Sequence, residues 1–229
     1  MIKLYFKQAF HLLKENKLLS SISIIGTALA IAMIMVIVIT LRATIAPFAP
    51  ESYRDRMLIF RYAGFQYKTN ENWQSNGPVS YKTAKACFKE MAAPEAVTIT
   101  SSFSETMLAA KPAGEKVSCS VLQVDDDFWK VFKFDFLSGY PFDKATFDAG
   151  ATKAVISEDI ARQLFGTSDV VGKTFLLNHS AYMICGVVRP VSKLARYAYA
   201  QIWIPLSSTD AFTAVSYTHL RAHETLMNL

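Results

Sequence analysis

The chain has 229 residues, of which 52% are hydrophobic and 19% charged, and its formal net charge is +5. The basic excess lies mainly before residue 18, whereas residues 51–210 hold 18 basic and 17 acidic side chains. Because the larger part of the chain is nearly neutral, it offers no basic groove for phosphates, and nucleic-acid binding is excluded as its function.

The chain is organised around an uncharged apolar run at residues 18–41, between Lys17 and Arg42. At about 1.5 Å per residue, this run gives a helix of about 36 Å, which exceeds a hydrocarbon core of about 30 Å. A signal peptide would have a shorter apolar region, and here Pro47 and Pro50 follow where cleavage would fall. We therefore predict an uncleaved transmembrane helix at residues 18–41.

Residues 1–17 carry apolar and basic side chains at helical spacing on different faces. This pattern predicts an amphipathic helix in the cytoplasmic headgroup layer, and the alternative is that the span itself begins there and protrudes into water. Lysines before the span and a near-neutral segment after it place the N-terminus in the cytoplasm and residues 43–215 outside.

Residues 43–215 are predicted to form one mixed domain of the α+β class, because strands and helices alternate with short links and hairpins. Strands are expected at residues 57–62, 97–101, 116–124, 153–156, 173–177, 182–188 and 201–204. Helices are expected at 80–91, after Asp125 and after Ser157, with a loop at 64–79. Ser80, Asp125 and Ser157 are predicted to cap these helices, and Gly166 to end the last one.

The three cysteines, Cys87, Cys119 and Cys185, are odd in number and widely separated. Three small buried thiols are the preferred interpretation. One disulfide outside the membrane is the alternative, and the spacing does not select a pair.

Three patterns resemble functional motifs. Gly166–Thr174 resembles a phosphate loop, but it has one residue too many between its glycines, and a helix precedes it where the motif requires a strand. His219 and His223 have the spacing of a helical zinc pair without a third ligand nearby. Asp125–Asp127 could hold a cation, but a helix cap with a solvated face is the preferred interpretation. We predict no catalytic, cofactor or metal site.

Two stretches together resemble the MacB/FtsX-type ABC transporter permeases. The first is the basic lead into the span, FKQAFHLLKENKLLSSISIIGTALAIA. The second is VDDDFWKVFKFDFLSGYPF, followed by KAVISEDIARQLFGTSDVVGKTFLLNHSAYMICGVVRP and IWIPLSS. The short matches follow the order of the family, although Tyr140 stands where the family usually has an arginine.

The resemblance implies a bacterial inner-membrane permease subunit whose large domain follows its first span. It also implies a separate cytoplasmic ABC ATPase, a second permease subunit in a dimer, and a periplasmic adaptor or outer-membrane channel. ATP-driven motion would be relayed to the domain to export or extract a peptide, drug or lipoprotein. An FtsX-like regulator of a cell-wall hydrolase or sensor kinase, and a complete single-span binding domain, are the alternatives.

The last residues, 216–229, look unlike the rest of the chain. Within them, SYTHLRAHET resembles a translated sequencing-adapter read-through. We therefore predict that residues 216–229 are not native and that the chain is a fragment of a longer permease. The alternative is a natural polar tail.

Overall fold

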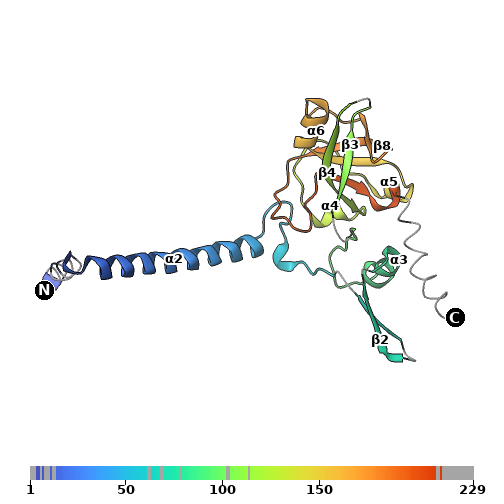
Figure 1. The fold of residues 1–229 in the computed structure, drawn as a ribbon. Coiled ribbons are helices and arrows are strands. Elements are labelled where there is room, and N and C mark those ends of the chain that lie inside the picture. Colours follow the sequence, from blue (N-terminus) through green and yellow to red (C-terminus); the bar gives the residue numbers. More distant parts are fainter. Residues whose placement is uncertain are drawn as a thin grey trace. The chain divides into compact units, whose positions relative to one another are not determined.

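The chain divides into an N-terminal unit, Met1–Ala46, and a second unit, Pro47–Leu229. The structure is a computed structural model (Figure 1), and it describes residues 4, 5, 7, 11, 14–60, 63–67, 70–77, 79–101, 104–112, 114–209 and 212.

The N-terminal unit is dominated by one apolar helix, α2 (Lys17–Ile45), none of whose side chains is buried. Among the described residues it is the helix that is long and apolar enough to cross a membrane. The hydroxyls of Thr27, Thr40 and Thr44 donate to carbonyl oxygens one turn earlier, at 2.7–3.0 Å. These bonds satisfy the three threonine hydroxyls within the helix, as an apolar surrounding requires.

The chain bends at Asn16, just before α2 begins. Of the predicted amphipathic helix at residues 1–17, seven positions are described and helical: Leu4, Tyr5, Lys7, His11, Lys14, Glu15 and Lys17, the last of which begins α2. Most of its predicted apolar face lies outside the described residues, so the interfacial helix stays a prediction.

In the described part of the second unit, seven strands form one mixed sheet in the order β5-β8-β6-β9-β4-β3-β7. The strands are β3 (Glu105–Ala110), β4 (Lys116–Val124), β5 (Phe136–Gly139), β6 (Lys153–Ser157), β7 (Thr174–Leu177), β8 (Ser180–Val188) and β9 (Ile202–Pro205). Because β7 also pairs with β8, six of these strands close into a ring, and β5 extends it beside the end of β8. The pairs β4–β9 and β6–β8 are parallel, whereas the others are antiparallel.

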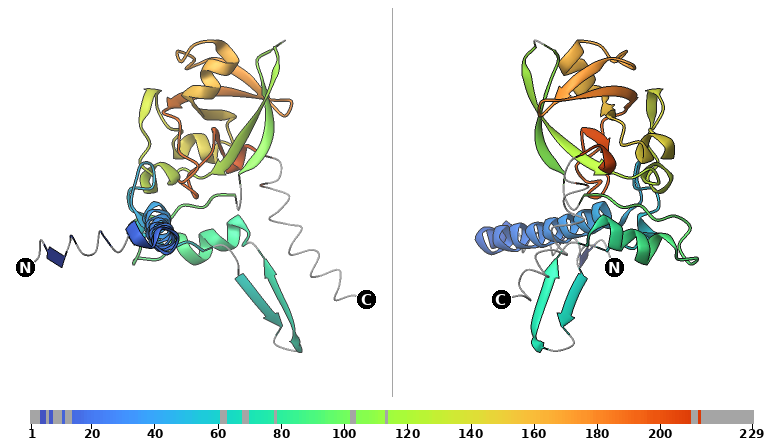
Figure 2. Two further views of the ribbon diagram at one scale, coloured as in Figure 1. Left: turned by 60° about the vertical axis from the view of Figure 1, so that its left-hand side comes forward. Right: turned by 90° about the vertical axis from the view of Figure 1, so that its right-hand side faces the viewer.

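Short helices and one separate hairpin complete the second unit (Figure 2). The helices are η1 (Arg54–Arg56), α3 (Tyr81–Ala84), the π-helical turn η2 (Lys85–Lys89), α4 (Phe128–Val131), α5 (Lys144–Asp148), α6 (Glu158–Phe165) and η3 (Leu206–Ser208). Strands β1 (Ala63–Tyr67) and β2 (Asn70–Gly77) form a two-stranded sheet of their own. This mixture of helices and sheet confirms the predicted α+β class.

Side chains on the two faces of the sheet build two cores. Neighbouring residues on one strand serve different cores: Ile156 packs with Ile160 of α6, whereas Val155 packs with Trp203 and the aromatic side chains around α4. Such alternation is the period of a strand that is buried on both faces. Trp203 is fully buried, and its indole nitrogen donates to the carbonyl oxygen of Ala198 at 3.1 Å.

Three predicted elements differ from the structure. Residues 57–60, predicted to begin a strand, have no regular structure and expose Leu58 completely, because none of the described residues pairs with them. The predicted loop at 64–79 is the β1–β2 hairpin, so cross-strand hydrogen bonds prevailed over its polar composition. The predicted strand at 97–101 is reduced to a single bridge between Thr100 and Val124.

The helix ends follow the predictions in part. The hydroxyl of Ser80 accepts from the Thr83 amide at 3.2 Å, and Gly166 ends α6 with φ of 74°, so both predictions are confirmed. Ser157 occupies the N-cap position of α6, but its buried hydroxyl has no hydrogen-bond partner among the described residues. The prediction that Asp125 caps α4 is wrong: Asp127 holds the N-cap position.

Candidate functional site

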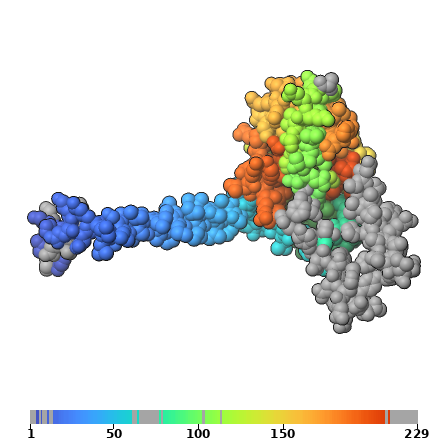
Figure 3. Space-filling model, in the orientation of Figure 1, coloured from blue at the N-terminus to red at the C-terminus, as the bar shows by residue number. Residues whose placement is uncertain are grey.

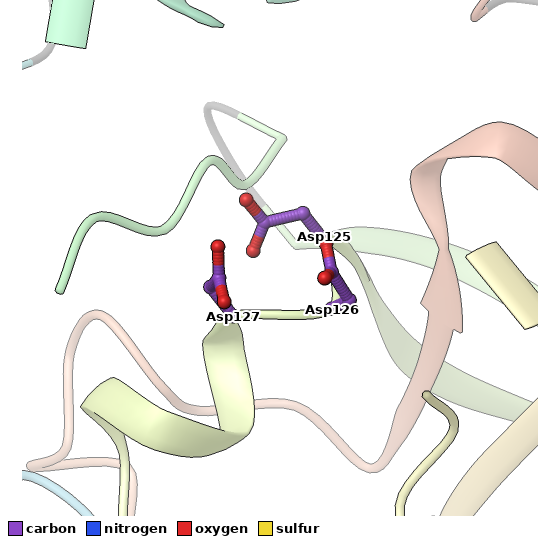
Figure 4. Close-up of side chains that lie close together, drawn as sticks. All are labelled: Asp125, Asp126 and Asp127. Carbon is purple, nitrogen blue, oxygen red and sulfur yellow. The ribbon is translucent and has the colours of Figure 1, made fainter. Parts of the chain in front are cut away.

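Three consecutive carboxylates form the aspartate cluster, Asp125, Asp126 and Asp127 (Figure 4). They lie on the link between β4 and α4, and one ligand oxygen from each lies within 4.8 Å of the others. Such a group of oxygen atoms has the chemistry to hold a hard cation.

A lysine from another part of the chain lies against this cluster. The Nζ atom of Lys89, at the end of η2, is 2.7 Å from carboxylate oxygens of both Asp125 and Asp127, and 3.9 Å from one of Asp126. The Lys89 side chain is only 16% exposed. Its ammonium group therefore pairs directly with Asp125 and Asp127, and Asp127 has a second cationic partner in Lys130 at 2.7 Å.

Asp125 is the buried centre of the cluster. Besides Lys89, it accepts from the Thr98 hydroxyl at 2.6 Å and from the Ile99 amide at 2.9 Å. Burial raises the pKa of the Asp125 carboxyl, and these three hydrogen bonds oppose that rise. The predicted solvated face is thus wrong for Asp125, which is fully buried.

The charges of the cluster are coupled. Burial opposes the charge of Lys89, but its hydrogen bonds to Asp125 and Asp127 prevail and raise the pKa of its ammonium group. Burial likewise disfavours ionised Asp127, yet hydrogen bonds from Lys130 and Lys89 lower the pKa of that carboxyl. The arrangement is an ion-pair latch that ties η2 to the start of α4. The sequence pattern pointed to the aspartates but carried no signal for Lys89.

A second charged centre lies in the elbow, residues 47–56, which directly follows the N-terminal unit. Glu51 is fully buried there. One of its carboxylate oxygens accepts from the amides of Tyr197 and Ala198 at 2.6 and 3.1 Å, and the other accepts from Nε of Arg54 at 2.7 Å. Glu51 therefore fixes the elbow to the loop between β8 and β9.

Arg54 reinforces this anchor. Its side chain is 10% exposed, it donates to the carbonyl oxygen of Leu194 at 2.5 Å, and its guanidinium lies 4.5 Å from the centre of the Phe48 ring. A charge that is both paired and stacked on an aromatic face is stabilised despite burial. The pair was not predicted from the sequence, since nothing in the local pattern marks Glu51 as buried.

The elbow also contacts the end of α4. The backbone amide of Lys133 donates to the carbonyl oxygen of Pro50 at 2.9 Å. The Nζ atom of the same lysine lies 4.6 Å from the centre of the Tyr53 ring. The α4 segment, residues 125–133, therefore meets the latch at one end and the elbow at the other.

The other predicted positions form no shared centre. At 166–174 a helix precedes the loop and β7 follows it, and Lys173 donates to the Asp169 carbonyl oxygen at 3.1 Å. His219 and His223 lie outside the described residues. Of the three thiols expected to be buried, only Cys119 is; Cys185 is partly buried, and the expectation is wrong for Cys87, which is exposed.

One open cavity of about 580 Å³ lies beside the β3–β4 turn. Figure 3 shows the β3–β4 pair (green) at the surface of the second unit. The cavity is lined by Lys111, Gly114, Glu115, Lys116, Val117, Ser118, Gln163 and Leu164, none of which belongs to the aspartate cluster or to residues 166–174.

Comparison with known proteins gives the family. The model of the MacB-like periplasmic core domain matches residues 20–226. The uncharacterized ABC transporter permease YknZ of Bacillus subtilis (strain 168) is 26% identical over 109 residues, which are 48% of this chain and 27% of that protein. The macrolide export ATP-binding/permease protein MacB of Pasteurella multocida (strain Pm70) is 30% identical over 92 residues, 40% of this chain and 14% of that protein.

These matches span about a quarter or less of the curated relatives. A solved domain of a putative permease protein from Porphyromonas gingivalis aligns with a TM-score of 0.50 and 20% identity, over 65% of this chain and 62% of that one, and it shares the fold. The family match covers most of the chain and includes both the sheet and nearly all of α2. The chain therefore belongs to the family of the MacB-like periplasmic core domain, as its sequence motifs indicated.

Proposed function

We propose that this chain is part of the permease subunit of a MacB/FtsX-type ABC transporter. In this proposal α2 crosses the bacterial inner membrane with the N-terminus in the cytoplasm and the second unit outside. A separate cytoplasmic ATPase drives the motion, two permease subunits form a dimer, and the domain passes the motion on to export or extract a substrate.

The observation that carries the proposal is one family match that runs through both α2 and the sheet. The permease and export functions in the names of the two relatives support it. The chemistry of the described residues agrees with a mechanical function, because the buried charges of the second unit are engaged in ion pairs that hold segments together.

Continuity of the chain supports the same proposal. Helix α2 ends at Ile45, and the fully buried Glu51 follows only a few residues later. In this proposal, a displacement of the end of the helix reaches the domain through the elbow. Because packed interiors are stiff, a segment fixed by a buried ion pair transmits such a displacement instead of absorbing it.

The topology can be tested with a cysteine that the chain already has. Cys87 is exposed in the second unit, so a membrane-impermeant maleimide should label it in spheroplasts. Cys87→Ser is the matched negative control. A second variant, His11→Cys in that background, should be labelled only after the membrane is permeabilised. The reverse pattern would contradict the proposed topology. An ABC ATPase recovered with the tagged chain from native membranes would test the proposed partner.

A further inference from the structure

We infer that the α4 segment, residues 125–133, mechanically couples the elbow to a side module, residues 79–101, which contains α3 and η2. The purpose of this coupling rests on the proposed function: the α4 segment would carry the motion of the membrane helix into the side module. The coupling itself is a property of the second unit and is measurable without transport.

At its C-terminal end, the segment is joined to the elbow. The Lys133 amide is bonded to Pro50, and the Lys133 side chain lies over Tyr53. Pro50 directly precedes Glu51, whose carboxylate holds the amides of Tyr197 and Ala198. The elbow therefore cannot shift without moving or breaking its bond to residue 133.

At its N-terminal end, the segment is joined to the side module. Asp125 and Asp127 both bond Lys89, and Asp125 also accepts from the Ile99 amide. The backbone continues this connection, because the amide of Asp125 donates to the carbonyl oxygen of Ile99 at 3.2 Å. Two separate parts of the side module, η2 and residues 98–101, thus converge on one carboxylate.

Between the two ends, the segment is short and stiff. The amides of Val131 and Phe132 donate to the carbonyl oxygens of Asp127 and Phe128 at 3.2 and 2.9 Å. Phe128 and Phe132 are buried, and their ring centres are 4.6 Å apart. A single helical turn with both aromatic side chains in a close-packed core moves as one body, and such a body links displacements at its two ends.

The chain offers a matched pair of lysines for the test. Lys89 and Lys130 both bond Asp127 at 2.7 Å, but Lys89 is 16% exposed and bridges to the side module, whereas Lys130 is 70% exposed and lies within α4. Hydrogen exchange would be measured by mass spectrometry on the full chain in nanodiscs, in the wild type, Lys89→Met and Lys130→Met. The readout is the exchange rate of the amides of Lys133, Tyr197 and Ala198, which lie at the far end of the proposed connection.

We expect Lys89→Met to speed exchange at these amides by about fivefold or more, the lower end of typical coupling between sites. Lys130→Met should change it by less than about twofold, as for an exposed ion pair. Asp127→Asn, which keeps the bonds of Asp125, is a milder second variant and should act in the same direction as Lys89→Met.

Changes confined to residues 85–101 would overturn the inference, because the latch would then be purely local. A uniform rise that includes the Gly166 amide of α6 would also overturn it, since Lys89 would then only stabilise the whole domain. Either result leaves the proposed function standing, because that proposal is decided by the labelling of Cys87.

Discussion

Replacing Arg54 by methionine tests the elbow anchor most directly. The variant keeps an unbranched apolar chain but removes the guanidinium, so the fully buried Glu51 carboxylate loses its ion-pair partner. Breaking a buried ion pair from one side costs about 3–5 kcal/mol. Because the amides of Tyr197 and Ala198 still bond that carboxylate, we expect the lower end, about 3 kcal/mol of unfolding free energy.

The assay is thermal unfolding of the detergent-solubilised full chain, followed by tryptophan fluorescence. For a domain of this size, about 3 kcal/mol corresponds to a fall in Tm of about 10 °C. Arg162→Met is the matched control, because Arg162 pairs with Glu158 on the surface of α6 and is 65% exposed. It should cost no more than about 0.5 kcal/mol. A loss below about 1 kcal/mol for Arg54→Met, or equal losses for both variants, would refute the reasoning.

Four further predictions concern other parts of the second unit. Burial raises the pKa of Cys119 and Cys185 to about 11, so alkylation of the native chain at pH 8 should modify one thiol rapidly and all three only after denaturation. Because these thiols ionise at lower pH in the unfolded chain, the free energy of unfolding should fall as the pH rises from about 8.5 to about 11. Equilibrium unfolding measured across this range tests the expectation, and a free energy of unfolding that stays constant would contradict it. Gly139→Ala should lower the free energy of unfolding in denaturant by about 2–4 kcal/mol, because φ is +70° and the new methyl group would meet a backbone oxygen at 2.2 Å. Gly166→Ala is the comparison: φ is +74° but the space around it is open, so the loss should be only about 1–2 kcal/mol. Removing residues 216–229 should change the free energy of unfolding by less than about 0.5 kcal/mol, and a loss above about 2 kcal/mol would show that the tail is packed and native.

The aspartate cluster shows the limit of a motif that is read locally. Three adjacent carboxylates suggested a cation site or a solvated cap, and both interpretations treat them as one group facing one environment. In the structure Asp125 is fully buried, whereas Asp127 is 22% exposed and shares its carboxylate between two lysines. Lys89 lies 38 residues before Asp127, so its position depends on how α3 and η2 pack and not on any spacing in the sequence.

Local physical chemistry determined several features of this protein from the sequence alone. An uncharged run long enough to cross a bilayer predicted α2, and alternating side chains predicted β4. The conformational freedom of glycine predicted the end of α6 at Gly166. The order of short motifs indicated the family. Each of these signals is contained in a few neighbouring residues, and for that reason each could be recognised without a structure.

Only the tertiary structure decided which segments meet. Residues 57–60 have the composition of a strand but no pairing partner among the described residues, whereas the polar residues of β2 form a strand because β1 lies beside them. The carboxylate of Glu51 finds its donors 146 residues away, at Tyr197. Burial and long-range pairing depend on the whole arrangement of the sheet, and the same local sequence is compatible with many arrangements. The anchor, the latch and the segment between them therefore became visible only in three dimensions.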